Sequence, residues 1–149
     1  MSTAAFFSVV RVAREHLGAI AELEKQCFSE PWSEASLNLL LTEAALGVVA
    51  LRGNAVVGYG GMLLAPGEGQ ITNVAVSPAA RRCGIGTKLL SVLCEEARAR
   101  GAEQMSLEVR VSNAAAIALY TSYGFETAGV RKHFYRNPTE DAFVMLCRL

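Results

Sequence analysis

The chain has 149 residues and no net charge at pH 7, because fourteen lysine and arginine residues balance fourteen aspartate and glutamate residues. A chain of this length holds one hydrophobic core, so we predict a single domain over residues 1–149. The balanced charge argues against a surface that binds nucleic acid in bulk, and we expect no direct nucleic-acid partner.

The cysteines and the apolar segments exclude further classes of protein. Four cysteines are scattered without a Cys-x-x-Cys pair, and the chain has two histidines, so we expect no metal and free thiols in a reducing compartment. Cys83, beside two arginines, is either a reactive thiol or a space-filling turn residue, and we favour the second interpretation. No uncharged stretch reaches the length and hydrophobicity of a membrane span, and the first residues lack a signal-peptide pattern. We therefore expect a cytoplasmic protein that does not contact a membrane.

The first third of the chain predicts one strand and two helices. Residues 7–13 alternate as a strand does, and residues 15–28 carry apolar side chains at helical spacing. Pro31 interrupts that helix, and Ser33 is placed to cap a second helix that runs to about Glu43. We expect both helices to form one layer against a sheet.

The next segment predicts a sheet of mixed direction. Apolar runs at residues 46–51 and 55–64 flank the hairpin signal Arg-Gly-Asn at residues 52–54. Three glycines weaken the second run, which indicates a bulge or close backbone packing. A turn at residues 66–69 leads into a strand at residues 71–76. Because strands and helices alternate from there on, we predict an α/β (α+β) fold.

The turn after that strand is built to approach a ligand closely. Ser77-Pro78 ends the strand, and apolar spacing predicts a helix over residues 87–100. Gly84 and Gly86 remove two Cβ atoms where the turn enters this helix, whose first amides lack partners and whose dipole is positive there. This arrangement suits a phosphate-bearing ligand. The alternative is a glycine-softened turn with solvated arginines.

Charged side chains near the turn favour a phosphate. Arg81, Arg82 and Lys88 add positive charge, and the arginine fork donates two hydrogen bonds at once. Two other phosphate motifs are excluded. Leu89 stands where a dinucleotide fingerprint needs its third glycine, and Thr87 stands where a P-loop needs lysine.

The last third predicts a strand, a helix and a strand pair. Residues 104–110 alternate strictly between apolar and polar, which places Glu108 on the face away from the core. Ser112 or Asn113 can cap a helix over residues 114–123, and the next glycine can end it. The last predicted elements are a strand at residues 125–132, a loop at residues 133–141 and a strand at residues 142–148.

These motifs resemble known families. Arg81-Arg82-Cys83-Gly84-Ile85-Gly86 is similar to the Gln/Arg-x-x-Gly-x-Gly/Ala acetyl-CoA signature of GNAT-fold N-acetyltransferases. Leu-Glu-Val-Arg-Val-Ser-Asn at residues 107–113 opens a run to Tyr120 that resembles the RimI-type ribosomal-protein-alanine N-acetyltransferases. Tyr-Gly-Phe at residues 123–125 and Glu-Asp-Ala at residues 140–142 extend that likeness over nearly the whole chain.

The resemblance implies the GNAT fold, with a central mixed, mostly antiparallel sheet of about seven strands, splayed in the middle and flanked by four helices. It also implies acetyl-CoA as the co-substrate, held by the splayed strand, by the glycine turn, and by an asparagine that could otherwise only cap its own helix. The cofactor-binding residues implied are Val74, Ala75, Val76, Arg81, Arg82, Cys83, Gly84, Ile85, Gly86, Thr87 and Asn113.

Acetyl transfer from a thioester to an amine needs a neutral amine, stabilisation of an oxyanion and a proton for the departing thiolate. The resemblance implies that Glu108 is the general base, directly or through water, and that Tyr120 gives the proton to the coenzyme A sulfur. Without the resemblance, we would favour a solvated strand carboxylate for Glu108 and an ordinary packing residue for Tyr120.

The acceptor, by the same resemblance, lies between the link of the first two helices and the last strand pair. The acceptor-binding residues implied are Phe28, Trp32, Phe134 and Tyr135, of which the first two could also plug the core. Relatives often have two consecutive tyrosines at the second pair, so this chain lacks one hydroxyl that could hold peptide backbone.

These features predict an enzyme that acetylates the N-terminal α-amine of a protein, by resemblance the alanine of a small-subunit ribosomal protein. The alternatives are acetylation of lysine side chains or small amines, and a non-catalytic module that binds acetyl-CoA. Binding alone needs neither Glu108 nor Tyr120, which argues against the module. The Glu-Asp-Ala motif at residues 140–142 argues for a peptide acceptor.

Overall fold

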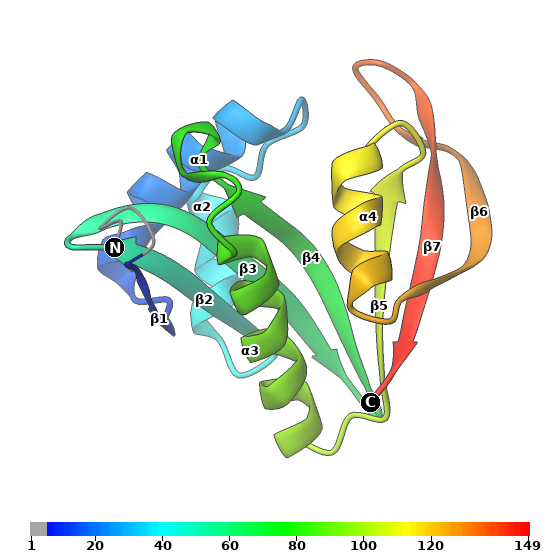
Figure 1. Cartoon of the computed structure of the whole chain (residues 1–149), viewed down its shortest axis with the longest axis horizontal. Helices are drawn as coiled ribbons and strands as arrows, with labels where there is room; N and C mark the ends of the chain where they lie inside the picture. Colours follow the sequence, from blue (N-terminus) through cyan, green and yellow to red (C-terminus); the bar gives the residue numbers. More distant parts are fainter. Residues whose placement is uncertain (1–5) are drawn as a thin grey trace.

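The computed structural model describes residues 6–149, which form a seven-stranded sheet with helices on both faces (Figure 1). Neighbouring strands are antiparallel except for β4 and β5, which are parallel, so the predicted mixed sheet is confirmed. In spatial order the strands are β1 (Ser8–Arg11), β2 (Ala45–Arg52), β3 (Ala55–Ala65), β4 (Glu68–Val76), β5 (Gln104–Arg110), β7 (Glu140–Arg148) and β6 (Glu126–Tyr135).

In the described part of the chain, four α-helices and three short 3-10 helices flank the sheet. On one face α3 packs across β2, β3 and β4, and α4 joins the same core, whereas α1 packs on β3 and β4 from the other face. Within residues 6–149, no helix is long and apolar enough to cross a membrane. The helices are α1 (Leu17–Cys27), α2 (Glu34–Leu37), α3 (Ile85–Ala99) and α4 (Ala114–Ser122), with 3-10 segments at Arg14–His16, Asn38–Leu41 and Pro78–Ala80.

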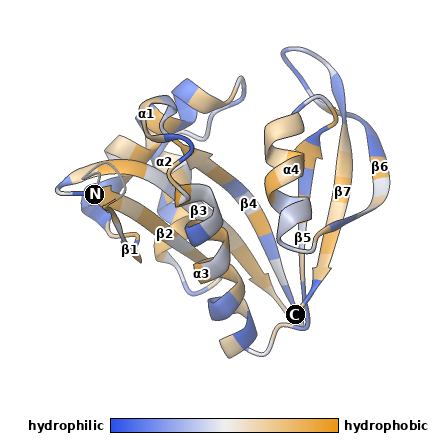
Figure 2. Cartoon of the chain, in the orientation of Figure 1, coloured by the Kyte–Doolittle hydropathy of each residue, from blue (hydrophilic) through white to orange (hydrophobic). Residues whose placement is uncertain are grey.

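Two hydrophobic cores lie on opposite faces of the sheet, and β2 contributes side chains to both. Val48 and Ala50 join the core under α3 and α4, and Val49 between them joins the core under α1 and α2. The sequence of a strand that is covered on both faces is continuously apolar and does not alternate between apolar and polar residues. Figure 2 shows this composition in β2 and β3, and polar residues on the edge strand β6.

The glycines of β3 allow α3 to lie close to the sheet, as predicted. A Cβ at Gly60 would lie 2.9 Å from Leu93 Cδ1 of α3, so Leu93 would have to move to make room for a side chain there. The register of β3 against β4 also shifts between Gly61 and Met62, which is the bulge that the glycines indicated.

β4 and β5 pair at their first residues and then separate. Among the described residues, their register runs from Glu68 opposite Gln104 to Gln70 opposite Ser106 and stops there. Further along, β4 still pairs with β3, and β5 with β7. The facing edges of β4 and β5 therefore keep backbone groups free of strand partners, which is the predicted splay.

The second helix is shorter than predicted. It begins at the predicted cap, where Ser33 Oγ accepts a hydrogen bond from Ser36 N at 3.1 Å, but it tightens into a 3-10 segment that ends at Leu41 rather than near Glu43. Tighter winding places residues three apart above one another, and Leu37 and Leu40 are both buried. The 3-10 winding thus lets both leucines be buried, and the segment does not continue as a regular α-helix.

The final strand pair is longer than predicted. β6 continues through residues 133–135, and Tyr135 pairs with Glu140, so the connecting loop covers residues 136–139 only. A register shift between Arg131 and Tyr135 accommodates the extra residues. Phe134 and Tyr135, expected on a loop, therefore lie on a strand.

Candidate active site

A cavity of about 800 Å³ opens where β4 and β5 separate. Its lining comes from both strands, from α4, from the link between α1 and α2, and from β6 and β7. It brings together Glu108 and Tyr120, which the resemblance put forward as the reacting pair. The other predicted site residues in the lining are Phe28, Trp32, Val74, Asn113, Phe134 and Tyr135. Phe28 and Trp32 also pack against the core under α1, so they serve as both plug and wall.

The remaining predicted residues lie outside this lining. The side chains of Ala75 and Ile85 are 3% and 1% exposed, so only their backbone groups can meet a ligand. The carbonyl of Val76 accepts hydrogen bonds from Arg81 Nε at 3.3 Å and from Cys27 Sγ at 3.6 Å. These contacts fix the end of β4 where the chain enters the glycine turn.

The turn before α3 bends through two left-handed residues, with φ of 66° at Arg82 and 80° at Gly84. Gly84 is the N-cap of α3 and offers no side chain to the amides of the first helical turn. A Cβ at Gly86 would lie 3.2 Å from Leu119 Cδ2, so the start of α3 lies directly beside α4. The turn thus presents unpaired amides at a positive helix end, which fits a phosphate group.

Glu108 projects into the cavity because β5 alternates strictly. Met105, Leu107 and Val109 are at most 5% exposed and pack under α3 and α4, which leaves Glu108 on the opposite face. Within residues 6–149, its carboxylate makes no hydrogen bond or ion pair. It is free to accept a proton from a group that enters the cavity.

Tyr120 enters the cavity from α4. Its ring is 6% exposed and packs on Phe125, with ring centroids 5.7 Å apart. In the part of the chain that the structure describes, its hydroxyl has no hydrogen-bond partner. Burial raises the pKa of this hydroxyl, and the nearby Tyr135 raises it further. Tyr120 therefore stays protonated at neutral pH and has a proton to donate.

Tyr135 forms the cavity wall next to Glu108. Burial raises the pKa of Tyr135 to about 12, and the negative charge of Glu108 adds to this rise. The guanidinium of Arg110 lies 4.5 Å above the ring centroid and acts in the opposite direction. Phe134, whose ring stands perpendicular to that of Tyr135, is 42% exposed and extends the apolar wall outward. Tyr135 thus offers a protonated hydroxyl beside a free carboxylate.

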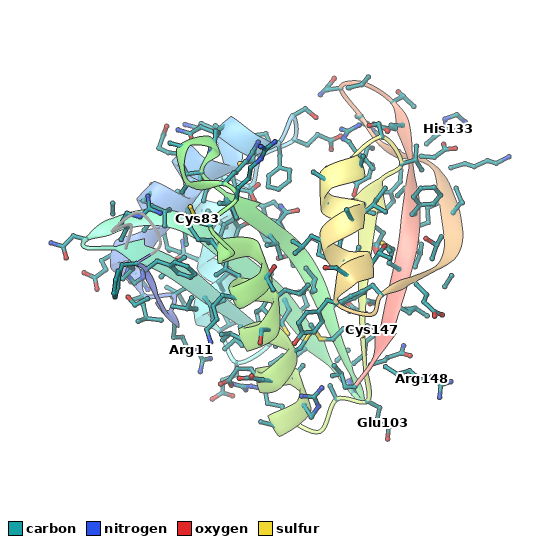
Figure 3. The ribbon with its side chains drawn as sticks, viewed as in Figure 1. Arg11, Cys83, Glu103, His133, Cys147 and Arg148 are labelled. Carbon is teal, nitrogen blue, oxygen red and sulfur yellow. The ribbon has the colours of Figure 1, made fainter. Side chains whose placement is uncertain are left out.

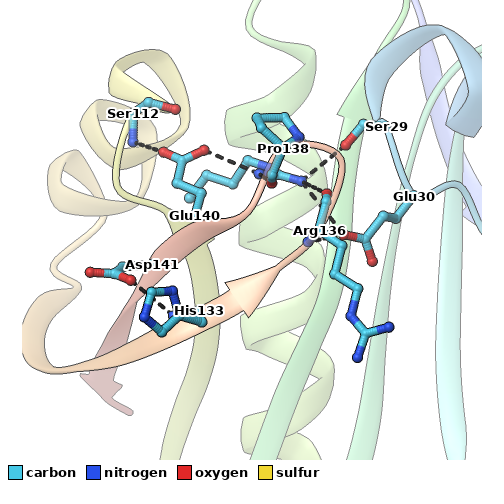
Figure 4. A network of polar contacts seen from close by, with 9 residues as sticks. Ser29, Glu30, Ser112, His133, Arg136, Pro138, Glu140 and Asp141 are labelled. Carbon is cyan, nitrogen blue, oxygen red and sulfur yellow. Dashed lines mark hydrogen bonds and ion pairs between the residues drawn. The ribbon is translucent and has the colours of Figure 1, made fainter.

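Arg110 joins the two segments that border the acceptor side of the cavity. Figure 4 shows its partners Ser29, Arg136, Pro138 and Glu140. Its Nη1 donates to the carbonyl of Pro138 at 2.9 Å and to Glu140 Oε1 at 3.1 Å. Its Nη2 donates to Ser29 Oγ at 2.9 Å and to the carbonyl of Arg136 at 2.7 Å. One side chain therefore holds the link between α1 and α2 against the loop between β6 and β7.

Two carboxylates complete this network. Glu30 Oε1 lies 3.7 Å from Arg110 Nη2 and also accepts from the backbone amide of Arg136. Glu140 Oε2 accepts from the backbone amide of Ser112 at 2.7 Å. Hydrogen bonds from Ser112 lower the pKa of Glu140, and Arg110 lowers it further, so Glu140 stays charged beside the guanidinium.

A second polar cluster supports the same link from beneath. Glu24 of α1 is 0% exposed, and its Oε1 accepts from the backbone amide of Trp32 at 2.8 Å. Its Oε2 accepts from Asn73 Nδ2 at 2.8 Å and from the hydroxyl of Tyr59. Burial and the charge of Glu24 raise the pKa of Tyr59, which keeps that donor protonated. The buried carboxylate thereby ties Trp32 to β3 and β4.

Sequence reasoning did not find these two clusters, although each left a signal. Glu24 lies on the apolar face of α1, four residues after Ile20 and three after Ala21, and this spacing indicates a buried carboxylate. Arg110 follows Glu108 by two residues on β5, which places both on the same face. Neither pattern identifies the partners, because those come from distant segments.

The cysteines lie apart and are unpaired thiols. Figure 3 shows Cys83 near the start of α3 and Cys147 on β7. The Cys83 thiol donates weakly to the carbonyl of Arg81 at 3.7 Å, within its own turn, in keeping with a space-filling residue. Over residues 6–149, no three His, Cys, Asp or Glu side chains gather as a metal site.

Residues 17–125 match the Acetyltransferase (GNAT) family. The chain belongs to the GNAT acetyltransferase family. The match spans the glycine turn, Glu108 and Tyr120, and GNAT acetyltransferases use acetyl-CoA as the acetyl donor. The seven-stranded mixed sheet with four α-helices is the fold expected of this family.

Individual proteins resemble this GNAT chain over most of its length. N-alpha-acetyltransferase RimI of Mycobacterium tuberculosis is 39% identical over 132 residues, which cover 84% of this chain and 82% of that protein. The ribosomal protein bS18-alanine N-acetyltransferase of Escherichia coli is 36% identical over 133 residues, covering 87% and 88%. The crystal structure of the ribosomal-protein-S18-alanine N-acetyltransferase from Escherichia coli superposes with a TM-score of 0.88 at 32% identity, over 96% of this chain and 94% of that chain.

Proposed function

We propose that this GNAT enzyme transfers the acetyl group of acetyl-CoA to the N-terminal α-amine of a protein, and that the acceptor is the alanine that begins ribosomal protein bS18. The name of the Escherichia coli relative supports this acceptor, and the name of the Mycobacterium tuberculosis relative supports transfer to an α-amine. One observation carries the chemistry. Glu108 and Tyr120 line one cavity where β4 and β5 separate, and within residues 6–149 neither the carboxylate nor the hydroxyl has a hydrogen-bond partner.

The donor side of the site suits acetyl-CoA. Its pyrophosphate accepts hydrogen bonds from the amides of residues 82–87, where the glycine turn leaves room, and Arg81 and Arg82 add positive charge. The pantetheine arm lies along residues 74–76, whose edge toward β5 has no strand partner among the described residues. Asn113 caps α4 through its oxygen, which accepts from Ala116 N at 3.1 Å, so its amide hydrogens remain for the ligand.

The reaction needs a base, an oxyanion site and an acid. An α-amine has a reference pKa of about 7.7 to 8.0, so part of it is already neutral near pH 7 after losing one proton to solvent, and Glu108 accepts the second proton, which the nitrogen releases as it attacks. The amine nitrogen attacks the thioester carbon, and backbone amides of residues 74–76 stabilise the oxyanion. The carbon–sulfur bond then breaks, and Tyr120 gives its proton to the departing thiolate. Solvent returns that proton to Tyr120 and takes the one held by Glu108.

The acceptor side suits the end of a polypeptide. Phe28 and Trp32 form one wall and Tyr135 the other, and the Arg110 network holds the walls together. The protonated hydroxyl of Tyr135 can donate to a peptide carbonyl next to the amine. A small first residue fits between these aromatic walls, which favours alanine over bulky residues.

Two substitutions test the chemistry. Glu108→Gln and Tyr120→Phe should each lower kcat by about 10²- to 10⁴-fold, the usual contribution of a general base or acid, while calorimetric affinity for acetyl-CoA changes little. Tyr123→Phe, at the C-cap of the same helix but outside the cavity lining, is the matched control and should keep its turnover. Full turnover of either test variant across the pH range contradicts the role assigned to that residue.

The acceptor is tested with matched peptides. A peptide that begins with alanine should have a higher kcat/KM than the same peptide pre-blocked at its N-terminus and carrying an internal lysine. The reason is that a flexible lysine stem loses more conformational entropy than an amine already fixed by its peptide. Replacing the alanine by tryptophan should lower kcat/KM through a clash with the cavity walls. The opposite ranking of alanine and lysine peptides assigns the enzyme to lysine side chains instead.

A further inference from the structure

β4 and β5 form a V that is closed at their first residues (Figure 1). A cluster of hydrogen-bond acceptors lies at this closed end. Glu68 Oε1 accepts from Gln104 Nε2 at 2.9 Å, and Glu68 Oε2 accepts from Gln70 Nε2 at 2.9 Å. Glu68, Gln70 and Ser106 all line the same cavity as Glu108. The acceptor cavity therefore continues from the reacting pair down to a carboxylate held in place by two amides.

The hydrogen bonds determine what this cluster can recognise. A carboxylate only accepts, so each glutamine must turn its amide nitrogen toward Glu68, and each amide oxygen is then left to face another donor. Hydrogen bonds from Gln70, and also from Gln104 and Ser106, lower the pKa of Glu68 against the opposing effect of partial burial. The cluster thus presents to the cavity a carboxylate that is charged at neutral pH and the amide oxygen of Gln70, a set that suits a multi-donor cation.

The charge of Glu68 has no counter-ion among residues 6–149, because none of the ion pairs there includes it. The other free carboxylate of the lining is Glu108, the proposed base, whereas Glu30 lies 3.7 Å from Arg110. Arg131, the second arginine of the lining, lies over the ring of Phe134, 5.7 Å from its centroid. A positive charge at Glu68 must therefore come from the ligand.

The spacing matches the start of a peptide. Glu68 pairs with Gln104, and Glu108 lies four residues further along β5, or about 13 Å at the rise of a strand. A chain whose amine lies at Glu108 and which runs extended toward Glu68 places its third residue about 7 Å along this path. A long side chain covers the rest, with half-buried Leu63 and Leu146 beside its apolar stem.

We propose that the cavity selects an acceptor with lysine or arginine near its third residue, and that Glu68 is the carboxylate that recognises this side chain. The inference rests on the proposed N-terminal acetyl transfer and narrows its acceptors to cationic chain ends. Basic N-terminal arms are typical of proteins that bind nucleic acid, so the selection fits a ribosomal acceptor.

The test compares two peptides that begin with alanine and differ only in lysine or glutamine at position 3. The wild-type enzyme should prefer the lysine peptide by about tenfold in kcat/KM, mostly through KM, which is the size of one charge-assisted hydrogen bond. In Glu68→Gln this ratio should fall to about one, because the substituted amide carries no charge. Added salt should also reduce the wild-type ratio by screening.

Glu103→Gln is the matched control, because Glu103 is exposed, borders Gln104 in sequence and lies outside the cavity lining. It makes the same change in net charge and should keep the lysine preference. If both peptides are acetylated at the N-terminus but wild type shows no preference, or Glu68→Gln keeps it, the inference is wrong and the proposed function stands. If wild type acetylates neither α-amine, the proposed function fails and the inference falls with it.

Discussion

Glu24→Gln isolates what the buried carboxylate contributes to the cavity wall. The change keeps the size of the side chain but replaces one acceptor oxygen by an amide that only donates. Glu24 Oε2 accepts from Asn73 and Tyr59, whereas Oε1 accepts from the amide of Trp32 alone. The glutamine therefore keeps its oxygen on the side of the two donors, and the Trp32 amide loses its partner.

The expected cost follows from this count of bonds. An unpaired buried amide costs about 1–3 kcal/mol, and making the acceptor neutral weakens the two remaining bonds by about 1 kcal/mol in sum. A neutral amide is also cheaper to bury than a carboxylate, which offsets part of the loss. We expect the free energy of unfolding to fall by about 2–3 kcal/mol, which lowers Tm by about 4–12 °C for a chain of this size.

Urea and thermal unfolding, followed by circular dichroism, measure this loss against Glu22→Gln as the matched control. Glu22 lies on the same helix, its side chain is 68% exposed and it pairs with Lys25 at 3.1 Å, so its loss should cost under about 0.5 kcal/mol. Because the freed amide belongs to Trp32, Glu24→Gln should raise KM for the acceptor peptide more than KM for acetyl-CoA. Equal stability of the two variants refutes the reasoning.

Changes at the glycine turn, at Arg110 and at Glu140 have separate expected effects. Gly84→Ala puts a Cβ where φ is 80°, at a cost of about 1–2 kcal/mol, and should raise KM for acetyl-CoA; Gly53→Ala, at φ of 62° in a hairpin, should lose similar stability and leave that KM unchanged. Arg110→Lys keeps the positive charge but loses the guanidinium that donates to several partners at once, so KM for the acceptor should rise several-fold in steady-state assays. An unchanged KM argues against the role of Arg110 in holding the two cavity segments together. The folded state lowers the pKa of Glu140 from 4.5, so the charged carboxylate stabilises the protein above pH 4.5, and this stabilisation is lost as the pH falls through the folded pKa. The difference in unfolding free energy between wild type and Glu140→Gln should therefore shrink below pH 4.5. A difference that stays constant contradicts this expectation.

Local patterns were enough to predict the elements that position the site. The strict alternation of residues 104–110 yields the bounds of β5 as the structure has them, and it places Glu108 opposite the buried face. Ser33 and Asn113 cap the helices that follow them, as their residue types indicated. These features depend on neighbours within a few residues, which is why sequence alone reveals them.

The polar clusters depend on contacts between distant segments. Arg110 donates to Ser29 across 81 residues of sequence, and Glu24 accepts from Asn73 across 49. Nothing near Arg110 in the chain distinguishes a clamp from a solvated arginine. The lengthening of β6 to Tyr135 is a similar case, because it is set by pairing with β7 rather than by its own residues.

Mass spectrometry of bS18 after reaction identifies the amine that the enzyme acetylates. Purified bS18 with a free N-terminal alanine is incubated with acetyl-CoA and either the wild-type enzyme or Glu108→Gln, and the acetylated position is mapped. We expect one acetyl group per chain on the alanine amine with the wild-type enzyme, formed at least about 10²-fold more slowly by the variant. Acetyl groups on lysine side chains, or no transfer by the wild-type enzyme, would contradict it.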